Sequence, residues 1–302
     1  MLTQRLLCHP LAARPARETR KAIVMTSDDE RHARAALTAL PARIWPSATD
    51  SRTDPVEVWK GLAPEHPGVD PARLLATATD AGWRFVIPSD PGWPATLTPG
   101  TGPLPVGLWA RGTGDLTGLT RRSVTITGAR LCSEYGQAVT AGLAYDLTTP
   151  LAAQPVTITA AGIGEGIDAA ALRIAATHRR AVAVLTATTG ITRYNRTLLT
   201  DVADGGLVLC LAAPGLPPRS GHLLARVRLL ATLTRATVLV ESTTRGYAFA
   251  TAQAARLRRR PVMAVPGPIG STLSAGPNAL LTEGTARLVT SAEDIRAVLD
   301  QT

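Results

Sequence analysis

The sequence predicts an α/β protein: a Rossmann-like, doubly wound parallel sheet preceded by a small N-terminal helical domain. From residue 123 onward, short β-branched runs alternate with alanine- and leucine-rich helical segments. Strands separated by helices pair in parallel and are covered on both faces. Between one strand and the next helix lie three glycines at alternate positions, Gly162, Gly164 and Gly166. Such a turn is typical of nucleotide-binding and phosphate-binding α/β folds.

The chain starts with a basic segment and a helical region. Residues 1–24 carry five basic side chains and one acidic, without an apolar period, and predict a disordered basic arm. An acidic run at residues 27–30 predicts the first turn of a helix. Further helices are expected at Pro55–Leu62 and Pro71–Ala81. Residues 25–82 therefore form a small helical domain in this interpretation.

Residues 83–118 predict a strand-containing connector packed on the next domain. Its strands are expected within 82–88 and 105–112, separated by a proline- and glycine-rich turn. Three tryptophans fall in this region, Trp83, Trp93 and Trp109. Packing against the next domain is the favoured interpretation, and an aromatic platform for nucleic-acid bases is the alternative.

Residues 119–302 predict the Rossmann-like domain. Six strands are expected, followed by a short one near Arg287–Val289: Val124–Thr127, Val156–Thr159, Ala181–Leu185, Leu207–Ala212, Ala236–Glu241 and Pro261–Val265. The helices between and after them are expected at Glu134–Thr148, Ile167–His178, Arg196–Ala203, His222–Thr234, Tyr247–Arg259, Asn278–Glu283 and Ala292–Leu299.

Composition limits the possible partners and compartments. Residues 119–302 carry 19 basic and 11 acidic side chains, whereas residues 25–118 carry 8 and 11. A polyanion, with nucleic acid first, is the natural partner of the basic part. No run of about 18 apolar residues indicates a membrane span. Three widely separated cysteines and no histidine cluster favour a cytoplasmic protein without a structural metal, and no cofactor is expected.

Candidate binding residues follow several of the predicted strands. Ligands of doubly wound sheets bind outside the carboxyl ends of the strands, which places Gly128, Gly162, Gly166 and Asp168 at one edge together with several arginines. The glycines would let a phosphate approach the backbone, and the next helix would offer free N–H groups. The alternative is that they only permit a close strand-to-helix turn. Arg226 and Arg228 are two apart on a helix and do not share a face.

At these positions the chain resembles the DNA-processing protein A (DprA/Smf) family over roughly residues 30–295. The resemblance rests on the order and spacing of short motifs: Gly128-Ala129-Arg130, Tyr135-Gly136, Gly162, Gly166-Ile167-Asp168, Arg173, Arg226, Arg228, Glu241, Arg245, Thr251-Ala252, Ala264-Val265-Pro266-Gly267, Gly276, Asn278 and Leu280. It implies a bacterial protein that binds single-stranded DNA without chemistry, commonly as a homodimer. It further implies loading of RecA during DNA transformation or recombination.

The resemblance assigns DNA contacts to nine residues: Gly128, Arg130, Gly162, Gly166, Asp168, Arg173, Arg226, Arg228 and Arg245. Asp168 has an alternative role as a cap on the first turn of its own helix, and Glu241 is expected to orient Arg245. Four arginines between residues 256 and 260 lie at a helix C-terminus, where compensation of the helix dipole explains them nearly as well as DNA does.

Departures from the family pattern are expected to fall on the binding pocket. Glu165 stands where the family has arginine or tyrosine, and a carboxylate there would repel phosphate. Leu172, Val227 and Leu211 replace a histidine, an asparagine and a polar residue. The family's winged-helix domain is not expected.

Two other classes of function are possible for such a fold. The first is a hydrolase of nucleoside monophosphates, but the Pro-Gly-Gly-x-Gly-Thr-x-x-Glu run that such enzymes carry is absent from the sequence. We therefore expect no enzymatic activity. The second is a nucleotide- or partner-binding module that keeps the fold and has lost affinity for DNA.

Overall fold

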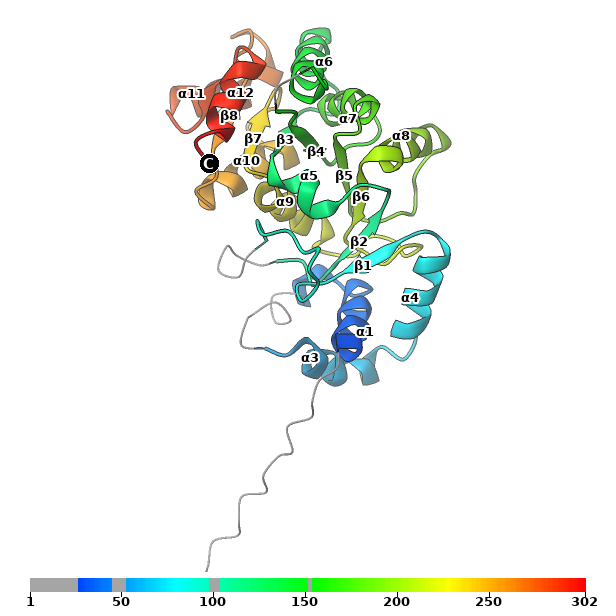
Figure 1. The fold of residues 1–302 in the computed structure, drawn as a ribbon. Coiled ribbons are helices and arrows are strands. Elements are labelled where there is room, and N and C mark those ends of the chain that lie inside the picture. Colours follow the sequence, from blue (N-terminus) through cyan, green and yellow to red (C-terminus); the bar gives the residue numbers. More distant parts are fainter. Residues whose placement is uncertain (1–26, 45–52, 98–103, 152–153) are drawn as a thin grey trace, which may run out of the picture.

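A nine-stranded sheet forms the centre of the protein (Figure 1). The computed structural model describes residues 27–44, 53–97, 104–151 and 154–302. The strands lie in the order β1-β2-β6-β5-β4-β3-β7-β8-β9. Their bounds are β1 Arg84–Val86, β2 Leu108–Arg111, β3 Ser123–Thr127, β4 Thr157–Ala160, β5 Ala181–Leu185, β6 Leu207–Cys210, β7 Ala236–Leu239, β8 Val262–Ala264 and β9 Arg287–Leu288.

Strands β3 to β9 pair in parallel, and helices cover both faces of their sheet. The sheet is centred on β3, β4 and β7, whose side chains are buried throughout. One face packs against α6 (Glu134–Thr148), α7 (Ile167–Thr177), α8 (Arg193–Gly205) and α12 (Ala292–Leu299). The other packs against α5 (Leu116–Arg121), α9 (His222–Leu233) and α10 (Tyr247–Leu257). The predicted fold class is therefore confirmed.

The region before β3 extends the same sheet. β2 pairs antiparallel with both β1 and β6, so residues 83–118 add two strands to the edge at β6. The predicted helix positions agree closely with the structure, and α6 and α12 have the predicted bounds. Helix α5 was not predicted. It begins at an N-cap, Asp115, whose carboxylate accepts a hydrogen bond from the amide of Gly118.

A small helical region packs against β1 and β2. It contains α1 (Ser27–Thr38), η1 (Ala42–Ile44), α3 (Pro55–Leu62), η2 (Ala63–Glu65) and α4 (Pro71–Asp80). Arg31 of α1 pairs with Asp90 at 2.6 Å, and Arg34 donates a hydrogen bond to the carbonyl of Val106 at 2.8 Å. The remaining elements are η3 (Thr272–Ser274) and α11 (Ala275–Thr282) near the C-terminus. The predicted basic arm, residues 1–24, lies outside the described residues.

The three tryptophans belong to the packed interior. Trp109 is buried, stacks near Phe85 and donates from its indole nitrogen to the Thr38 hydroxyl at 3.0 Å. Trp83 is also buried, and Trp93 is half-buried with its indole donating to the carbonyl of Leu97. The alternative of an aromatic platform for bases is therefore wrong. Within the described part of the chain, no helix combines the length and the hydropathy that a bilayer crossing requires.

Candidate functional site

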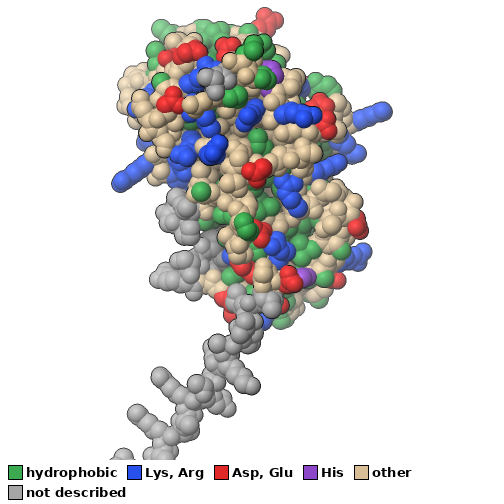
Figure 2. Space-filling view, viewed as in Figure 1, with side chains coloured by type: hydrophobic (Ala, Val, Ile, Leu, Met, Phe, Trp, Pro, Cys, Tyr) green, Lys and Arg blue, Asp and Glu red, His purple; other side chains and the backbone are tan. Residues whose placement is uncertain are grey.

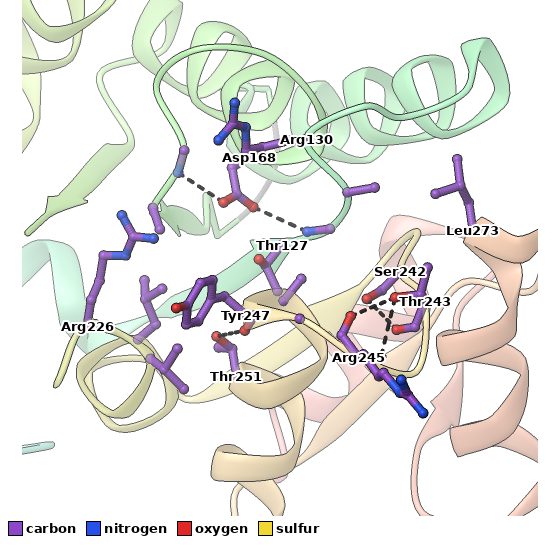
Figure 3. Close-up of a pocket in the computed structure, with 18 residues that line it drawn as sticks. Thr127, Arg130, Asp168, Arg226, Ser242, Thr243, Arg245, Tyr247, Thr251 and Leu273 are labelled. Atoms are coloured by element: carbon purple, nitrogen blue, oxygen red, sulfur yellow. Dashed lines mark hydrogen bonds between the residues drawn. The ribbon is translucent and has the colours of Figure 1, made fainter. Parts of the chain in front are cut away.

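A cavity of about 270 Å³ opens at the carboxyl ends of β3, β4 and β7 (Figure 3). Six of the nine candidate DNA contacts line it: Gly128, Arg130, Gly162, Asp168, Arg226 and Arg245. They come from the loops after β3, β4 and β7, from the first turn of α7 and from α9, which the parallel sheet brings to one edge. The other wall is formed by α10 and the turn before it, including Ser242, Thr243, Tyr247 and Thr251.

Asp168 joins two of these loops. Its carboxylate accepts hydrogen bonds from the amides of Gly128 at 3.3 Å and Gly162 at 2.9 Å, and also from the Thr127 side chain. Burial raises the pKa of this carboxyl, while these hydrogen bonds and the charge of Arg226 act in the opposite direction. The predicted cap on its own helix is wrong, because the bonds reach across to β3 and β4. Asp168 thus occupies two amides that were expected to be open to a phosphate.

The glycines at this edge are explained by contacts within the protein. Gly166 has φ +85°, and a β-carbon there would lie 2.2 Å from the carbonyl oxygen of Ala129. A β-carbon on Gly128 would lie 2.5 Å from the Ile167 side chain. The amide of Ile167, at the start of α7, donates to the carbonyl of Ala129 at 3.1 Å. These contacts favour the interpretation that the glycines permit a close crossing of two loops.

Arg226 is the cation whose guanidinium points into the cavity (Figure 3). Burial lowers the pKa of Arg226, an effect that the charges of Asp168 and Tyr247 partly offset. Its Nε is buried and has no hydrogen-bond partner, and no carboxylate of the described residues forms an ion pair with it. A partly desolvated guanidinium without a bonded partner is suited to an incoming phosphate.

Arg245 and Glu241 do not form the predicted pair. Arg245 lies on the exposed turn before α10, and its guanidinium points away from Asp168 (Figure 3). The buried carboxylate of Glu241 instead accepts hydrogen bonds from the amide of Ser133, at 2.9 Å, and from its hydroxyl. Ser133 is the N-cap of α6. Glu241 therefore ties the end of β7 to the start of α6, and the prediction that it orients Arg245 is wrong.

Three candidate contacts lie outside the cavity. Gly166 sits behind it, at the loop crossing. Arg173 donates to the carbonyl of Gly164 at 3.0 Å and stacks over Tyr194. Arg228 lies two residues from Arg226 but its charge acts on Arg258, at the end of α10. The expected separation of these two arginines by helix geometry is therefore confirmed.

Most of the departures from the family pattern lie away from the cavity. Leu172 and Leu211 are buried in the core, where they pack the two faces of the sheet. Glu165 is exposed and does not line the cavity. Val227 does line it. The expectation that these changes fall on the binding pocket is thus correct only for Val227, because Leu172 and Leu211 turn inward to the core and Glu165 turns out to solvent.

Tyr247 is a residue of the cavity wall that the candidate DNA contacts did not include. Its ring lines the cavity beside Arg226 (Figure 3), and the residue is 54% exposed, so it is available for stacking on a base. Phe249, two residues on, packs into the cluster beneath α10. Thr127 was not singled out from the sequence, and Thr251 was named only as part of a family motif and not as a candidate contact. A threonine at the end of a strand or within a helix gives no local signal of a site.

Comparisons with known proteins identify a family model and several relatives that match this chain. The family model described as DNA recombination-mediator protein A matches residues 84–300. A putative DNA processing protein DprA of Mycobacterium tuberculosis is 37% identical over 228 residues, which cover 71% of this chain and 57% of the relative. DprA of Streptococcus pneumoniae is 32% identical over 197 residues, covering 64% and 66%. The chain thus spans little more than half of the Mycobacterium tuberculosis relative.

Two solved structures share the architecture. The X-ray structure of DprA from Streptococcus pneumoniae superposes with a TM-score of 0.66 at 28% identity, covering 80% of each chain. A structure of DprA from Helicobacter pylori, described for its single-stranded DNA binding mode, superposes with a TM-score of 0.61 at 22% identity. It covers 72% of this chain and 96% of its own. At 22% identity, the similarity to the Helicobacter pylori structure concerns the fold alone.

Proposed function

Because this chain belongs to the DNA recombination-mediator protein A family, we propose that it binds single-stranded DNA and acts as a recombination mediator in transformation or recombination. The observation that carries the proposal is Arg226, a partly buried guanidinium that faces the cavity and has no bonded partner among the described residues. Tyr247, beside Arg226, adds a ring for a base. Phosphate and base contacts side by side are what a single strand requires.

The contacts divide into two groups in this proposal. Arg226, Arg130 and Arg245 contact phosphates, whereas Gly128, Gly162, Gly166 and Asp168 shape the loops that hold them. Arg173 steadies the glycine turn through Gly164. No bond is made or broken, so the protein is a binding protein and not an enzyme. Loading of RecA, assembly as a homodimer and a cytoplasmic location belong to the same proposal.

Fluorescence anisotropy with labelled oligonucleotides tests this function. We expect tighter binding to single-stranded DNA than to duplex, with an affinity that falls as salt rises. Arg226→Ala should weaken binding about tenfold, since a charge-assisted hydrogen bond is removed. Arg43→Ala, an exposed arginine on η1, is the matched control. No binding in low salt, or equal effects of both substitutions, would remove the proposal.

A second function has one observation in its favour. Asp168 already occupies the amides of Gly128 and Gly162, which a phosphate at the glycine turn would otherwise use. A nucleotide- or partner-binding module that does not grip DNA is consistent with that arrangement. Thermal stabilisation by mononucleotides in a protein that fails to bind oligonucleotides would favour it.

A further inference from the structure

A second group of arginines lies at the opposite edge of the sheet. Because the strands are parallel, their amino ends share one edge, and several of them are preceded directly by arginine. Arg235 stands immediately before β7 and Arg260 two residues before β8, and these strands are neighbours. Arg258 and Arg259 follow the end of α10, and Arg228 reaches toward them from α9. We call Arg228, Arg235, Arg258, Arg259 and Arg260 the amino-edge cluster.

Like charges are crowded in this cluster. The pKa of Arg258 is lowered by burial and by the charge of Arg228, and the pKa of Arg260 is lowered by burial and by Arg235. None of the five forms an ion pair with a carboxylate side chain of the described residues. The carboxylates of Glu283 and Asp300 pair with Arg256 and Arg122 instead.

The helix dipole accounts for only part of the cluster. Arg258 donates to the carbonyl of Ala254 at 3.0 Å, as a side chain at a helix C-terminus should. Arg235 instead donates to the carbonyls of Arg121 and Thr302, and Arg228 lies within its helix. Arg259 has φ +56°, a conformation that favours glycine. Glycine would fit this backbone conformation better than arginine, so the conformation does not explain the charged side chain at position 259.

The cluster lies within reach of the cavity along one side of the molecule. Arg226 lines the cavity, and two residues further along α9 the charge of Arg228 acts on Arg258. Arg235 and Ser242 flank β7 and are seven residues apart, roughly 20 Å at the rise of a strand. Lys and Arg side chains are spread across the upper part of the molecule in Figure 2, including the side where α10 and the carboxyl-terminal end of the described chain lie.

We propose that the amino-edge cluster is a second contact surface for a sugar-phosphate backbone, which holds the part of a single strand that continues beyond the cavity. The inference rests on the proposed DNA binding. Phosphates supply the counter-charge that no carboxylate side chain of the described residues provides at these arginines, and a flexible single strand follows a path between two separated sites. The contacts are to phosphate, so they carry no sequence preference.

The test compares oligothymidylates of roughly six and roughly thirty nucleotides, a range that brackets the site sizes of single-strand binders. The first variant, Arg258→Gln with Arg260→Gln, removes two charges from the cluster. The matched control, Arg43→Gln with Arg73→Gln, removes two charges from exposed positions in the helical region. We expect the wild type to bind the long oligonucleotide more tightly than the short one. In the cluster variant this difference in affinity should be much smaller. Its salt slope should fall by about 0.7 for each phosphate that the variant no longer neutralises.

A second variant separates binding from folding. Arg259→Gly relieves a left-handed backbone conformation, so it should raise the melting temperature while weakening binding to the long oligonucleotide. If both cluster variants bind the long oligonucleotide as tightly as the control variant does, the inference is overturned. An acidic protein would then be the expected partner of this surface. Failure of the wild type to bind any oligonucleotide would instead overturn the proposed function, and this inference with it.

Discussion

Gly136 lies directly against the buried carboxylate of Glu241: a β-carbon at position 136 would come within 2.3 Å of Oε2. The glycine sits in the first turn of α6, whose N-cap Ser133 is the residue that Glu241 binds. The close approach lets one carboxylate join the end of β7 to the start of α6. Tyr135 supports the same corner by donating from its hydroxyl to the carbonyl of Pro266 at 2.7 Å.

Gly136→Ala should therefore destabilise the protein by about 1–3 kcal/mol, because the methyl group must displace Glu241 from Ser133. Gly142→Ala is the control in the same helix, since a β-carbon there meets nothing within 4 Å. Alanine is a better helix former, so the control should be stabilising by roughly 0.5–1 kcal/mol. Urea unfolding of both variants checks the pair, and equal effects would show that the contact with Glu241 is unimportant.

Gly166→Ala tests the crossing of the two loops. Both Gly166 and Gly190 have positive φ, but a β-carbon meets backbone oxygens only at Gly166. Gly190→Ala should cost about 1–2 kcal/mol for the left-handed conformation alone. Gly166→Ala should cost more, because the β3–α6 loop must also move. The midpoints of urea unfolding check this order. If Gly190→Ala lowers the midpoint more than Gly166→Ala does, the proposed contact of a β-carbon at position 166 with backbone oxygens is unimportant.

Asp168→Ala should have opposite effects on stability and binding. Stability falls by about 1–3 kcal/mol because the amides of Gly128 and Gly162 lose their acceptor. Affinity for single-stranded DNA rises, since a negative charge leaves the cavity and two N–H groups become free. Asp146→Ala, an exposed carboxylate of α6, controls for net charge. Weaker binding by Asp168→Ala would contradict this expectation and show that the loop geometry held by Asp168 matters more for binding than its charge.

The difference in unfolding free energy between the wild type and Asp168→Ala should depend on pH, and the direction of that dependence follows from the pKa of Asp168. The folded-state pKa of Asp168 is raised, chiefly by burial. A raised pKa gives a stability contribution that is present below the unfolded value of 3.8 and lost as pH rises through the folded value. The gap between wild type and Asp168→Ala should therefore be wider in acid than at neutral pH, as measured by urea midpoints at several pH values.

His222 couples stability to pH in the other direction. Its Nδ1 accepts from the amide of Arg219 at 3.1 Å, so the neutral ring carries its proton on Nε2, which faces the carbonyl of Leu40 at 3.2 Å. Protonation of Nδ1 breaks the first bond. Burial lowers the pKa of His222. Its contribution is thus present above the unfolded value of 6.5 and lost as pH falls through the lower folded value.

We expect urea midpoints of the wild type to drop between about pH 7.5 and about pH 5. His222→Gln should show a smaller drop over the same interval, because glutamine does not titrate. Since His222 joins α9 to the helical region at residue 40, loss of the bond should also loosen that contact. An unchanged pH dependence in the variant would exclude His222 as its source.

Local pattern was sufficient for much of the fold. The alternation of β-branched runs with helical segments predicted the parallel sheet, because buried strands and amphipathic helices have different periods. The two-residue spacing of Arg226 and Arg228 predicted that they face different ways, since helix geometry fixes that angle. Helix α5 was missed, because six residues with Gly118 in the middle give no period. The strand at Leu108–Arg111 was predicted, but not its pairing with β6.

The sequence by itself determined the order of strands and helices, the edge at which the candidate residues meet, and the excess of positive charge in the second part of the chain. Only the tertiary structure decided which hydrogen-bonding groups at this edge already have a partner within the protein. Asp168 takes the amides of Gly128 and Gly162, Glu241 takes Ser133, and Asn278 binds both backbone groups of Gly267. Asp168 lies 40 residues from Gly128, and Glu241 lies 108 residues from Ser133. Hydrogen-bond partners depend on the paths of loops in space, which no local periodicity records.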